Sequence, residues 1–236
     1  MVNWLGVSIL LAALAAGLAT SRALPRVGLA SGYAWELIPI ALIGGVAGAK
    51  LWAAVETLFS PGEPGFWQVL ASRSGATFYG GLGLGLAALI AKATFDRAPA
   101  RAVTTAIAPG LALGQAIGRI GCFLVGDDYG VPTTLPWGMS FPHGLPPTFE
   151  RVHPAQLYES LWLFAAAGLL WRRIARSRLL FGEYLVLQGV GRFAIEIVRT
   201  NPRTVGPLST SQLIALGCVA VGAIALRRAR PRLAAT

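Results

Sequence analysis

Charged side chains stand inside segments that are otherwise apolar. Arg119 lies in GQAIGRIGCFLVGDDYG, Arg192 and Glu196 lie in GRFAIEIVR, and Glu159 opens another apolar segment. A charge at the centre of a membrane helix costs at least about 2.5 kcal/mol on insertion scales, so each of these residues is a functional candidate. The planar guanidinium of arginine donates two parallel hydrogen bonds to a phosphate and stays protonated. Arginines converging from different helices predict a site for a lipid phosphodiester.

The acidic neighbours of these arginines admit two interpretations. Arg192 and Glu196 have i, i+4 spacing, so both project from one helix face and can form a buried ion pair that only fixes helix register. Arg119 has no acidic residue on its own face before Asp127, so it needs a partner from another helix or an anionic ligand, and we favour the ligand. Asp127 and Asp128 can orient the arginines, or they can be solvated carboxylates at a helix end.

The segment VHPAQLYES adds polar groups near a helix start. His153 precedes Pro154, which can occupy the first turn of a helix, and Gln156, Tyr158 and Glu159 then fall in the first two turns. A polar helix entrance is the alternative to a site role. The chain has two histidines without cysteines nearby, which do not make a metal site. We expect neither a metal nor a cofactor.

The composition indicates the environment of these residues. Of 236 residues, 55% are apolar and 13% charged, with a mean hydropathy of +0.61. Soluble domains carry about 25% charged residues, so an all-α integral membrane protein is expected. The net charge of +10 comes from basic residues between apolar stretches, which fits the positive-inside rule better than a nucleic-acid surface. Cys122 and Cys218 both lie in apolar segments and indicate no disulfide framework.

Seven stretches reach or approach the length of about 20 residues that a bilayer core requires. They cover roughly residues 2–20, 34–59, 76–95, 102–125, 156–171, 180–198 and 207–226. This pattern predicts one polytopic domain, 1–236, built as a bundle of about seven transmembrane helices. The first stretch is expected to be a retained helix rather than a cleaved signal peptide. The glycines at 44, 45, 48, 83 and 85 suit close helix packing better than a nucleotide-binding motif.

The distribution of basic residues predicts the orientation. One side collects 13 of the 20 Lys and Arg residues: Arg22, Arg26, Lys92, Arg97, Arg101, Arg172, Arg173, Arg176, Arg178, Arg227, Arg228, Arg230 and Arg232. This bias puts the C-terminus in the cytoplasm and the N-terminus outside. The outer connections are then 60–75, 126–155 and 199–206. The connection 126–155 is rich in proline and holds both histidines, so we expect an ordered loop at the membrane interface.

Four motifs together resemble the bacterial prolipoprotein diacylglyceryl transferases. They are FYGGL, GRIGCFLVGDDYG, HPAQLYE and GRFAIEIVR, and the resemblance covers most of the chain, which is identified as a divergent member. The resemblance implies transfer of the diacylglyceryl group of phosphatidylglycerol to the lipobox cysteine thiol of a preprolipoprotein, releasing glycerol phosphate. It implies phosphatidylglycerol, the preprolipoprotein signal peptide and membrane lipids as partners, with no nucleic acid. The bacterial cytoplasmic membrane is the implied location, with the active site toward the outer leaflet.

The resemblance also implies site residues. Expected catalytic residues are Arg119, Arg192, Glu196, Asp127, Tyr79 and His153, and expected substrate-binding residues are Gly80, Gly81, Cys122, Gly130, Gln156, Tyr158, Glu159 and Arg199. The two arginines of the first group would grip the phosphate, Asp127 and Glu196 would orient them, and Tyr79 or His153 would assist the proton.

The chain departs from the family pattern at several positions. Tyr79 stands where some members have a histidine proposed as the base, Cys122 replaces the usual asparagine, Leu5 replaces a common tyrosine, and Lys50 stands where arginine is usual. A thiol with a pKa near 8.5 must be deprotonated, and a phenol with a pKa of about 10 is a poor base unless arginines lower that pKa. The base therefore stays open. The alternative function is a catalytically inactive paralogue that binds lipid or lipopeptide; a transporter is disfavoured because no internal repeat is evident.

Overall fold

The structure is a computed structural model that describes residues 4–59, 65–72, 77–177 and 179–229, without the side chains of Leu5, Phe59, Phe78 and Tyr79. Within these ranges the chain forms eight α-helices: α1 (Trp4–Ala23), α2 (Ala34–Phe59), α3 (Phe66–Ala71), α4 (Phe78–Phe95), α5 (Ala100–Val125), α6 (Ala155–Arg173), α7 (Leu180–Ile195) and α8 (Thr210–Arg228). Short 3-10 helices follow α1 as η1 (Leu24–Val27) and η2 (Ser31–Tyr33) and follow α7 as η3 (Glu196–Val198).

The helices agree with the seven predicted stretches, each of which contains one long helix, while α3 lies in the connection 60–75. Within the described residues, four helical stretches are long and apolar enough to cross a membrane: Gly6–Val27, Ser31–Leu58, Ala100–Val125 and Thr210–Arg228. Gly80–Phe95 is apolar but shorter. The chain is thus an integral membrane protein made mostly of helices, as its composition predicted.

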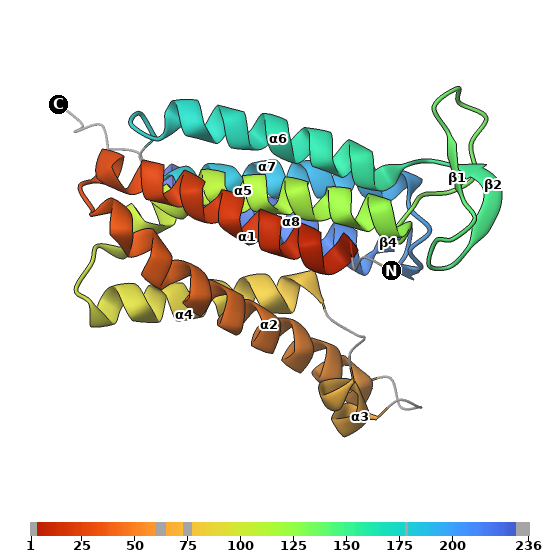
Figure 1. The fold of residues 1–236 in the computed structure, drawn as a ribbon, viewed down its shortest axis with the longest axis horizontal. Coiled ribbons are helices and arrows are strands. Elements are labelled where there is room, and N and C mark those ends of the chain that lie inside the picture. Colours follow the sequence, from red (N-terminus) through yellow and green to blue (C-terminus); the bar gives the residue numbers. More distant parts are fainter. Residues whose placement is uncertain (1–3, 60–64, 73–76, 178, 230–236) are drawn as a thin grey trace.

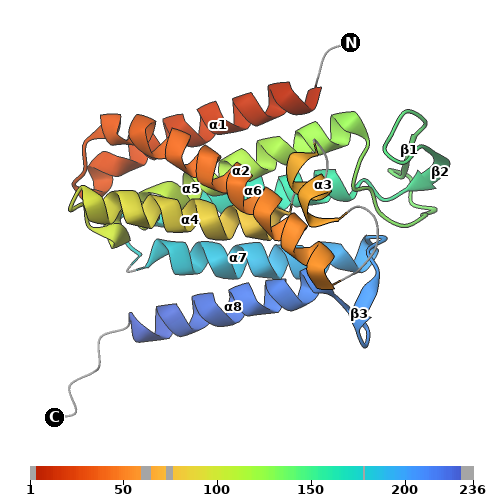
Figure 2. The same cartoon turned by 90° about the horizontal axis from the view of Figure 1, so that it is seen from below.

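The long helices lie side by side, with α1 packed on α5, α5 on α6 and α7 on α8 (Figures 1 and 2). Helices α2 and α4 form a pair of their own, and α2 runs obliquely toward α3. The predicted packing through glycine is found in this pair, where Gly44, Gly48 and Gly85 leave no free space for a Cβ against the facing helix. Gly83 faces open space instead.

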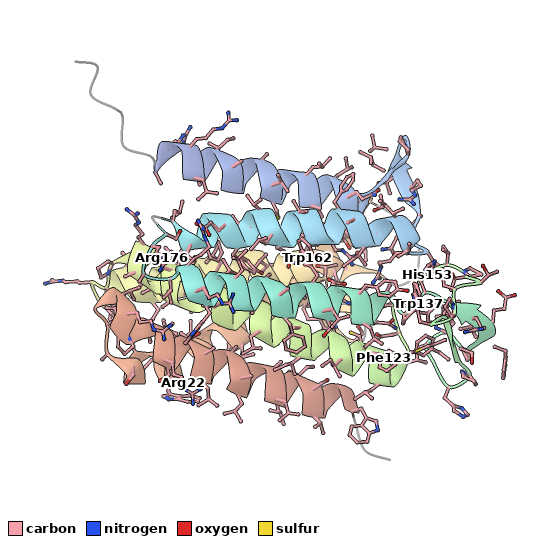
Figure 3. All side chains as sticks on the ribbon, turned by 90° about the horizontal axis from the view of Figure 1, so that it is seen from above. Arg22, Phe123, Trp137, His153, Trp162 and Arg176 are labelled. Atoms are coloured by element: carbon pink, nitrogen blue, oxygen red, sulfur yellow. The ribbon has the colours of Figure 1, made fainter. Side chains whose placement is uncertain are left out.

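The buried apolar core lies toward one end of the bundle. It joins the end of α1 and the start of α2 to the end of α4, the start of α5 and the turn between α6 and α7, with Leu24, Leu37, Leu170, Leu180 and Tyr184 almost fully buried. The predicted cytoplasmic arginines, such as Arg22 and Arg176, lie at this same end (Figure 3). Leu37, Leu89 and Ile107 of this core also line the larger of the two cavities described below.

The prediction of an all-α fold is wrong for the connections at the opposite end. The connection 126–155 contains the antiparallel strands β1 (Met139–Phe141) and β2 (Thr148–Val152), and β3 (Arg203–Val205) pairs with β4 (Leu208–Ser209) before α8. Prolines exclude helix from the first connection, whereas its aromatic and β-branched residues suit short strands. Both hairpins lie at one end of the bundle, opposite the end where α8 finishes (Figure 1).

Candidate active site

Six charged side chains form a closed ring of ion pairs near the hairpin end of the bundle. The arginine ring consists of Arg119, Glu159, Arg192, Glu196, Arg199 and Asp128. On one side of the ring, Arg119 pairs through Nη1 with Asp128 at 2.8 Å and through Nε with Glu159 at 3.0 Å. The same Glu159 oxygen, Oε2, also accepts from Arg192 Nη1 at 3.3 Å. Glu159 therefore joins the two arginines expected to bind phosphate.

The remaining contacts close the ring. Arg192 Nη2 lies 3.1 Å from Glu196, which confirms the ion pair that the i, i+4 spacing predicted. Glu196 in turn lies 3.6 Å from Arg199 Nε, and Arg199 Nη2 pairs with Asp128 at 2.6 Å. Three arginines thus face three carboxylates, and the ring has no net charge. Such pairing compensates charges that would be too costly alone in a membrane protein.

The ring joins three separate parts of the chain, residues 119–128, the start of α6 and residues 192–199. Arg119 comes from the end of α5, Glu159 from the start of α6, Arg192 from α7, and Glu196 from η3. Serine and asparagine side chains complete the coordination of Glu196, because Ser209 Oγ and Asn201 Nδ2 each donate to its Oε1 at 2.7 Å. The side chain of Glu196 has no exposed surface, so this carboxylate is the most deeply buried of the three.

Asp128 takes the position that sequence reasoning gave to Asp127. Helix α5 is capped after Val125 by Gly126 in the left-handed conformation with φ of +73°, and Asp128 also has a positive φ of +62°. This turn directs the Asp128 carboxylate toward Arg119 and Arg199. Burial raises the pKa of Asp128, but the two guanidinium groups outweigh it and the net pKa is lowered.

Asp127 forms no ion pair with an arginine within the described residues. Its Oδ1 is buried without a hydrogen-bond partner, and burial, followed by the charge of Asp128, raises its pKa. Within the described residues, Asp128 rather than Asp127 contacts the arginines, and the orienting role expected of Asp127 stays a prediction. Ligand atoms of Cys122, Asp127 and Asp128 lie within 4.8 Å of one another, but the arginines already bound to Asp128 disfavour a cation there.

Close backbone packing fixes the loop that follows α5 and carries Asp128. Gly130 N–H donates to the His153 carbonyl at 2.8 Å, and the next amide, of Val131, donates to the Val198 carbonyl at 2.8 Å. A Cβ on Gly130 would clash with the Val198 carbonyl and lie 2.8 Å from His153 Cβ. The fully buried Gln156 donates through Nε2 to the carbonyl of Asp127. Gly130 and Gln156 therefore position the loop that carries Asp128.

His153 belongs to an aromatic cluster beside the ring. Trp137 Nε1 donates to Tyr158 Oη at 2.9 Å, and the same hydroxyl lies 3.2 Å from His153 Nδ1. Trp137 and His153 both lie at the hairpin end of the bundle (Figure 3). The Tyr158 hydroxyl accepts from the indole and can either donate to Nδ1 or accept from it, according to the tautomer of His153. The side chain of His153 thus forms its hydrogen bond with Tyr158, and within the described residues no ion pair joins His153 to the arginine ring.

Two largely apolar cavities meet at Arg119 and Cys122. The first, of about 490 Å³, is lined by α1, α2, α5, α6 and α7 and includes Glu159 and Arg192. The second, of about 640 Å³, lies among α1, α2, α4 and α5 and includes Asp128. Cys122 Sγ lies 3.8 Å from Arg119 Nη1. Both cavities can accommodate apolar chains while presenting a guanidinium at their common border.

The comparison with known proteins identifies the family. The sequence model of the family described as prolipoprotein diacylglyceryl transferase matches residues 1–228. The chain belongs to the prolipoprotein diacylglyceryl transferase family. The prediction of the family and of the enzyme class from four motifs is confirmed.

Relatives named phosphatidylglycerol-prolipoprotein diacylglyceryl transferase match most of this chain. The protein from Gloeobacter violaceus is 35% identical over 238 residues, covering 95% of this chain and 87% of the relative. The protein from Clostridium tetani is 32% identical over 223 residues, covering 92% and 89%. The protein from Synechococcus elongatus is 36% identical over 182 residues, covering 68% and 63%.

In this prolipoprotein diacylglyceryl transferase, other predicted site residues lie away from the ring. Gly80 faces the Gly48 carbonyl and Gly81 faces that of Gly45, so both allow α2 and α4 to approach closely, and Gly81 also lines the larger cavity. The Tyr79 side chain lies outside the described residues. Lys50 ties α2 to α3, because its Nζ donates to the Val69 carbonyl at 3.1 Å.

Sequence reasoning missed how the members of the ring are paired. Glu159 was expected to bind substrate, yet it bridges Arg119 and Arg192. Arg199 was also expected to bind substrate, but its guanidinium bonds to the side chain and carbonyl of Asp128, and it is not part of the described lining of either large cavity. The signal available in the sequence was the charge balance, since three arginines and four acids occur in the three motifs that converge here.

Proposed function

We propose that this protein transfers the diacylglyceryl group of phosphatidylglycerol to the lipobox cysteine thiol of preprolipoproteins, in lipoprotein maturation. The observation that carries the proposal is the placement of Arg119 and Arg192, held by one shared carboxylate, in the wall of an apolar cavity. An apolar cavity with cationic side chains at its border suits a lipid with an anionic head group. The family and the names of the relatives supply the reaction.

The proposal includes the placement in the membrane. We infer one polytopic domain, 1–236, whose seven long helices cross the bacterial cytoplasmic membrane, with the N-terminus outside and the C-terminus inside. Arginines at the turns α4–α5 and α6–α7 and at the ends of α1 and α8 support this orientation. The loop 126–155 and the arginine ring then lie toward the outer leaflet, where a lipoprotein precursor presents its lipobox after translocation.

The hydrogen-bond pattern of the ring leaves donors for a phosphate. Arg119 uses Nε and Nη1 for carboxylates, so its Nη2 makes no hydrogen bond within the described residues. Arg192 uses Nη1 and Nη2, which leaves Nε. We assign these two groups to the phosphate and refer to Arg119 and Arg192 as the clamp arginines. Arg199 instead supports Asp128, and Glu159 and Glu196 orient the clamp arginines.

The transfer step breaks one bond and forms one. The substrate thiolate attacks the glycerol carbon that bears the phosphate, a C–S bond forms, and the C–O bond breaks with its electron pair going to the phosphate oxygen. The clamp arginines stabilise the charge that develops on the departing glycerol phosphate. The thiol proton must leave as the thiolate forms. His153, which is reached through Tyr158, and Tyr79 are the two proposed acceptors.

The first test is transfer itself. Purified protein in micelles that contain phosphatidylglycerol is mixed with a fluorescent lipobox peptide, and mass spectrometry reports the diacylglyceryl increment on cysteine. We expect product from the parent and from Arg26→Ala, whose arginine stacks on Trp171 at the other end of the bundle, but not from Arg119→Ala. A folded parent that retains phosphatidylglycerol without forming product, beside an active transferase, would identify an inactive binding paralogue.

A further inference from the structure

Two glutamines precede the clamp arginines by one helical turn. Gln115 stands four residues before Arg119 on α5, and Gln188 stands four residues before Arg192 on α7. Residues with this spacing share a helix face and lie about 6 Å apart along the axis. All four side chains line the cavity of about 490 Å³. The same cavity wall therefore carries a pair of amide side chains one helical turn before the pair of arginines.

The two glutamines lie deeper in the cavity than the arginines. Helices α5 and α7 both run toward the hairpin end, so residues that precede the arginines lie nearer to the middle of the bundle (Figure 2). Apart from Cys122 and the ring, the other described lining consists of Ile, Leu, Ala and Gly. The amides are consequently the polar groups in a part of the cavity suited to acyl chains.

The hydrogen bonds of the glutamines leave donors unused. The buried Tyr184 hydroxyl donates to Gln115 Oε1 at 3.1 Å, which leaves Nε2 as a donor, and this nitrogen is buried without a partner. Gln188 is 6% exposed, and its amide makes no hydrogen bond within the described part of the chain. A buried donor without a partner, as at Gln115 Nε2, is unfavourable, and the Gln188 amide keeps accessible polar atoms in the same cavity wall, so both side chains favour a ligand that brings acceptors.

The chemistry of a diacyl lipid supplies acceptors at this depth. In a glycerophospholipid the phosphate is attached to one end of the glycerol, and two ester carbonyls follow a few bonds further in, before the acyl chains. We propose that Gln115 and Gln188 donate hydrogen bonds to the two ester carbonyls while Arg119 and Arg192 hold the phosphate. This inference rests on the proposed function and adds a specificity, because a lipid with ether-linked chains has no carbonyl oxygen there.

The experiment compares two lipids in one assay. Phosphatidylglycerol with ester-linked chains and its ether-linked analogue of the same chain length are each tested with the lipobox peptide, and kcat/KM is measured for both. We expect the parent to prefer the diester by roughly 25-fold, which is about fivefold for each of two neutral hydrogen bonds. Gln115→Leu and Gln188→Leu should each reduce the preference to about fivefold, and the double variant should abolish it.

The ratio between lipids separates this role from a structural one. A partly unfolded variant loses activity on both lipids equally, so the ratio is unaffected, and Gln115→Met offers a second substitution if the leucine variant does not fold. Leu111→Ala changes the same cavity wall one turn deeper without removing a donor, and its ratio should match that of the parent. Equal rates on both lipids in the parent, or an unchanged ratio in the glutamine variants, would overturn the assignment. A parent inactive on both lipids would instead refute the proposed function, and this assignment with it.

Discussion

Replacing Asp128 by asparagine tests whether Asp128, which pairs with two arginines of the ring, matters more for transfer than Asp127, the residue that the family resemblance implies. Asp128 accepts from Arg119 at 2.8 Å and from Arg199 at 2.6 Å. Two buried charge-assisted hydrogen bonds would contribute about 3 to 6 kcal/mol. The Asp128 side chain is 43% exposed, and solvent screening together with the acceptor that asparagine retains reduces the loss to roughly 2 kcal/mol. We therefore expect kcat/KM for transfer to fall roughly 30-fold in Asp128→Asn.

The matched control is the neighbouring carboxylate. Asp127→Asn removes the same charge from the same loop, but Asp127 has no ion pair with an arginine in the described residues, so it should lose less activity than Asp128→Asn. Both variants are assayed with the lipobox peptide in phosphatidylglycerol micelles. Thermal-unfolding curves of separate samples first establish that both variants are folded. The reasoning fails if Asp128→Asn transfers at the parent rate while Asp127→Asn is inactive, because the motif position would then outweigh the observed geometry.

Two further predictions concern stability. Gly130→Ala should destabilise the protein by about 1 to 3 kcal/mol because its Cβ meets backbone on the facing segment, whereas Gly118→Ala, which meets nothing within 4 Å, should not; thermal unfolding of the two variants gives the comparison. The lowered pKa of Asp128 means that its ion pairs stabilise the fold above the ordinary aspartate pKa of about 3.9 and lose this effect as the pH falls through the lowered pKa. The difference in unfolding temperature between the parent and Asp128→Asn should therefore shrink in acid, and a difference that persists at the lowest pH would contradict this.

The sequence predicted those features that depend on one segment at a time. Apolar length located the seven long helices, and the i, i+4 spacing gave the pair Arg192–Glu196. Partners from different segments could not be assigned in this way, because helix rotation and the α5 turn decide them. Glu159 thus bridges two helices, and a positive φ at Asp128 selects it over Asp127. The hairpins were missed because each strand has at most five residues, too few for a clear alternation.

Charge balance explains how the charged groups of the ring can be buried and still stabilise a reacting phosphate. With three arginines against three carboxylates, the guanidinium groups are compensated and held in place before a lipid enters, so little reorganisation is needed when charge develops. A bound phosphodiester carries one negative charge, and breaking its C–O bond adds negative charge to the departing phosphate. Stabilisation by Arg119 Nη2 and Arg192 Nε therefore grows as the reaction proceeds. Interactions that are stronger in the transition state than in the ground state accelerate a reaction. A neutral ring with free donors thus favours turnover over tight retention of the lipid.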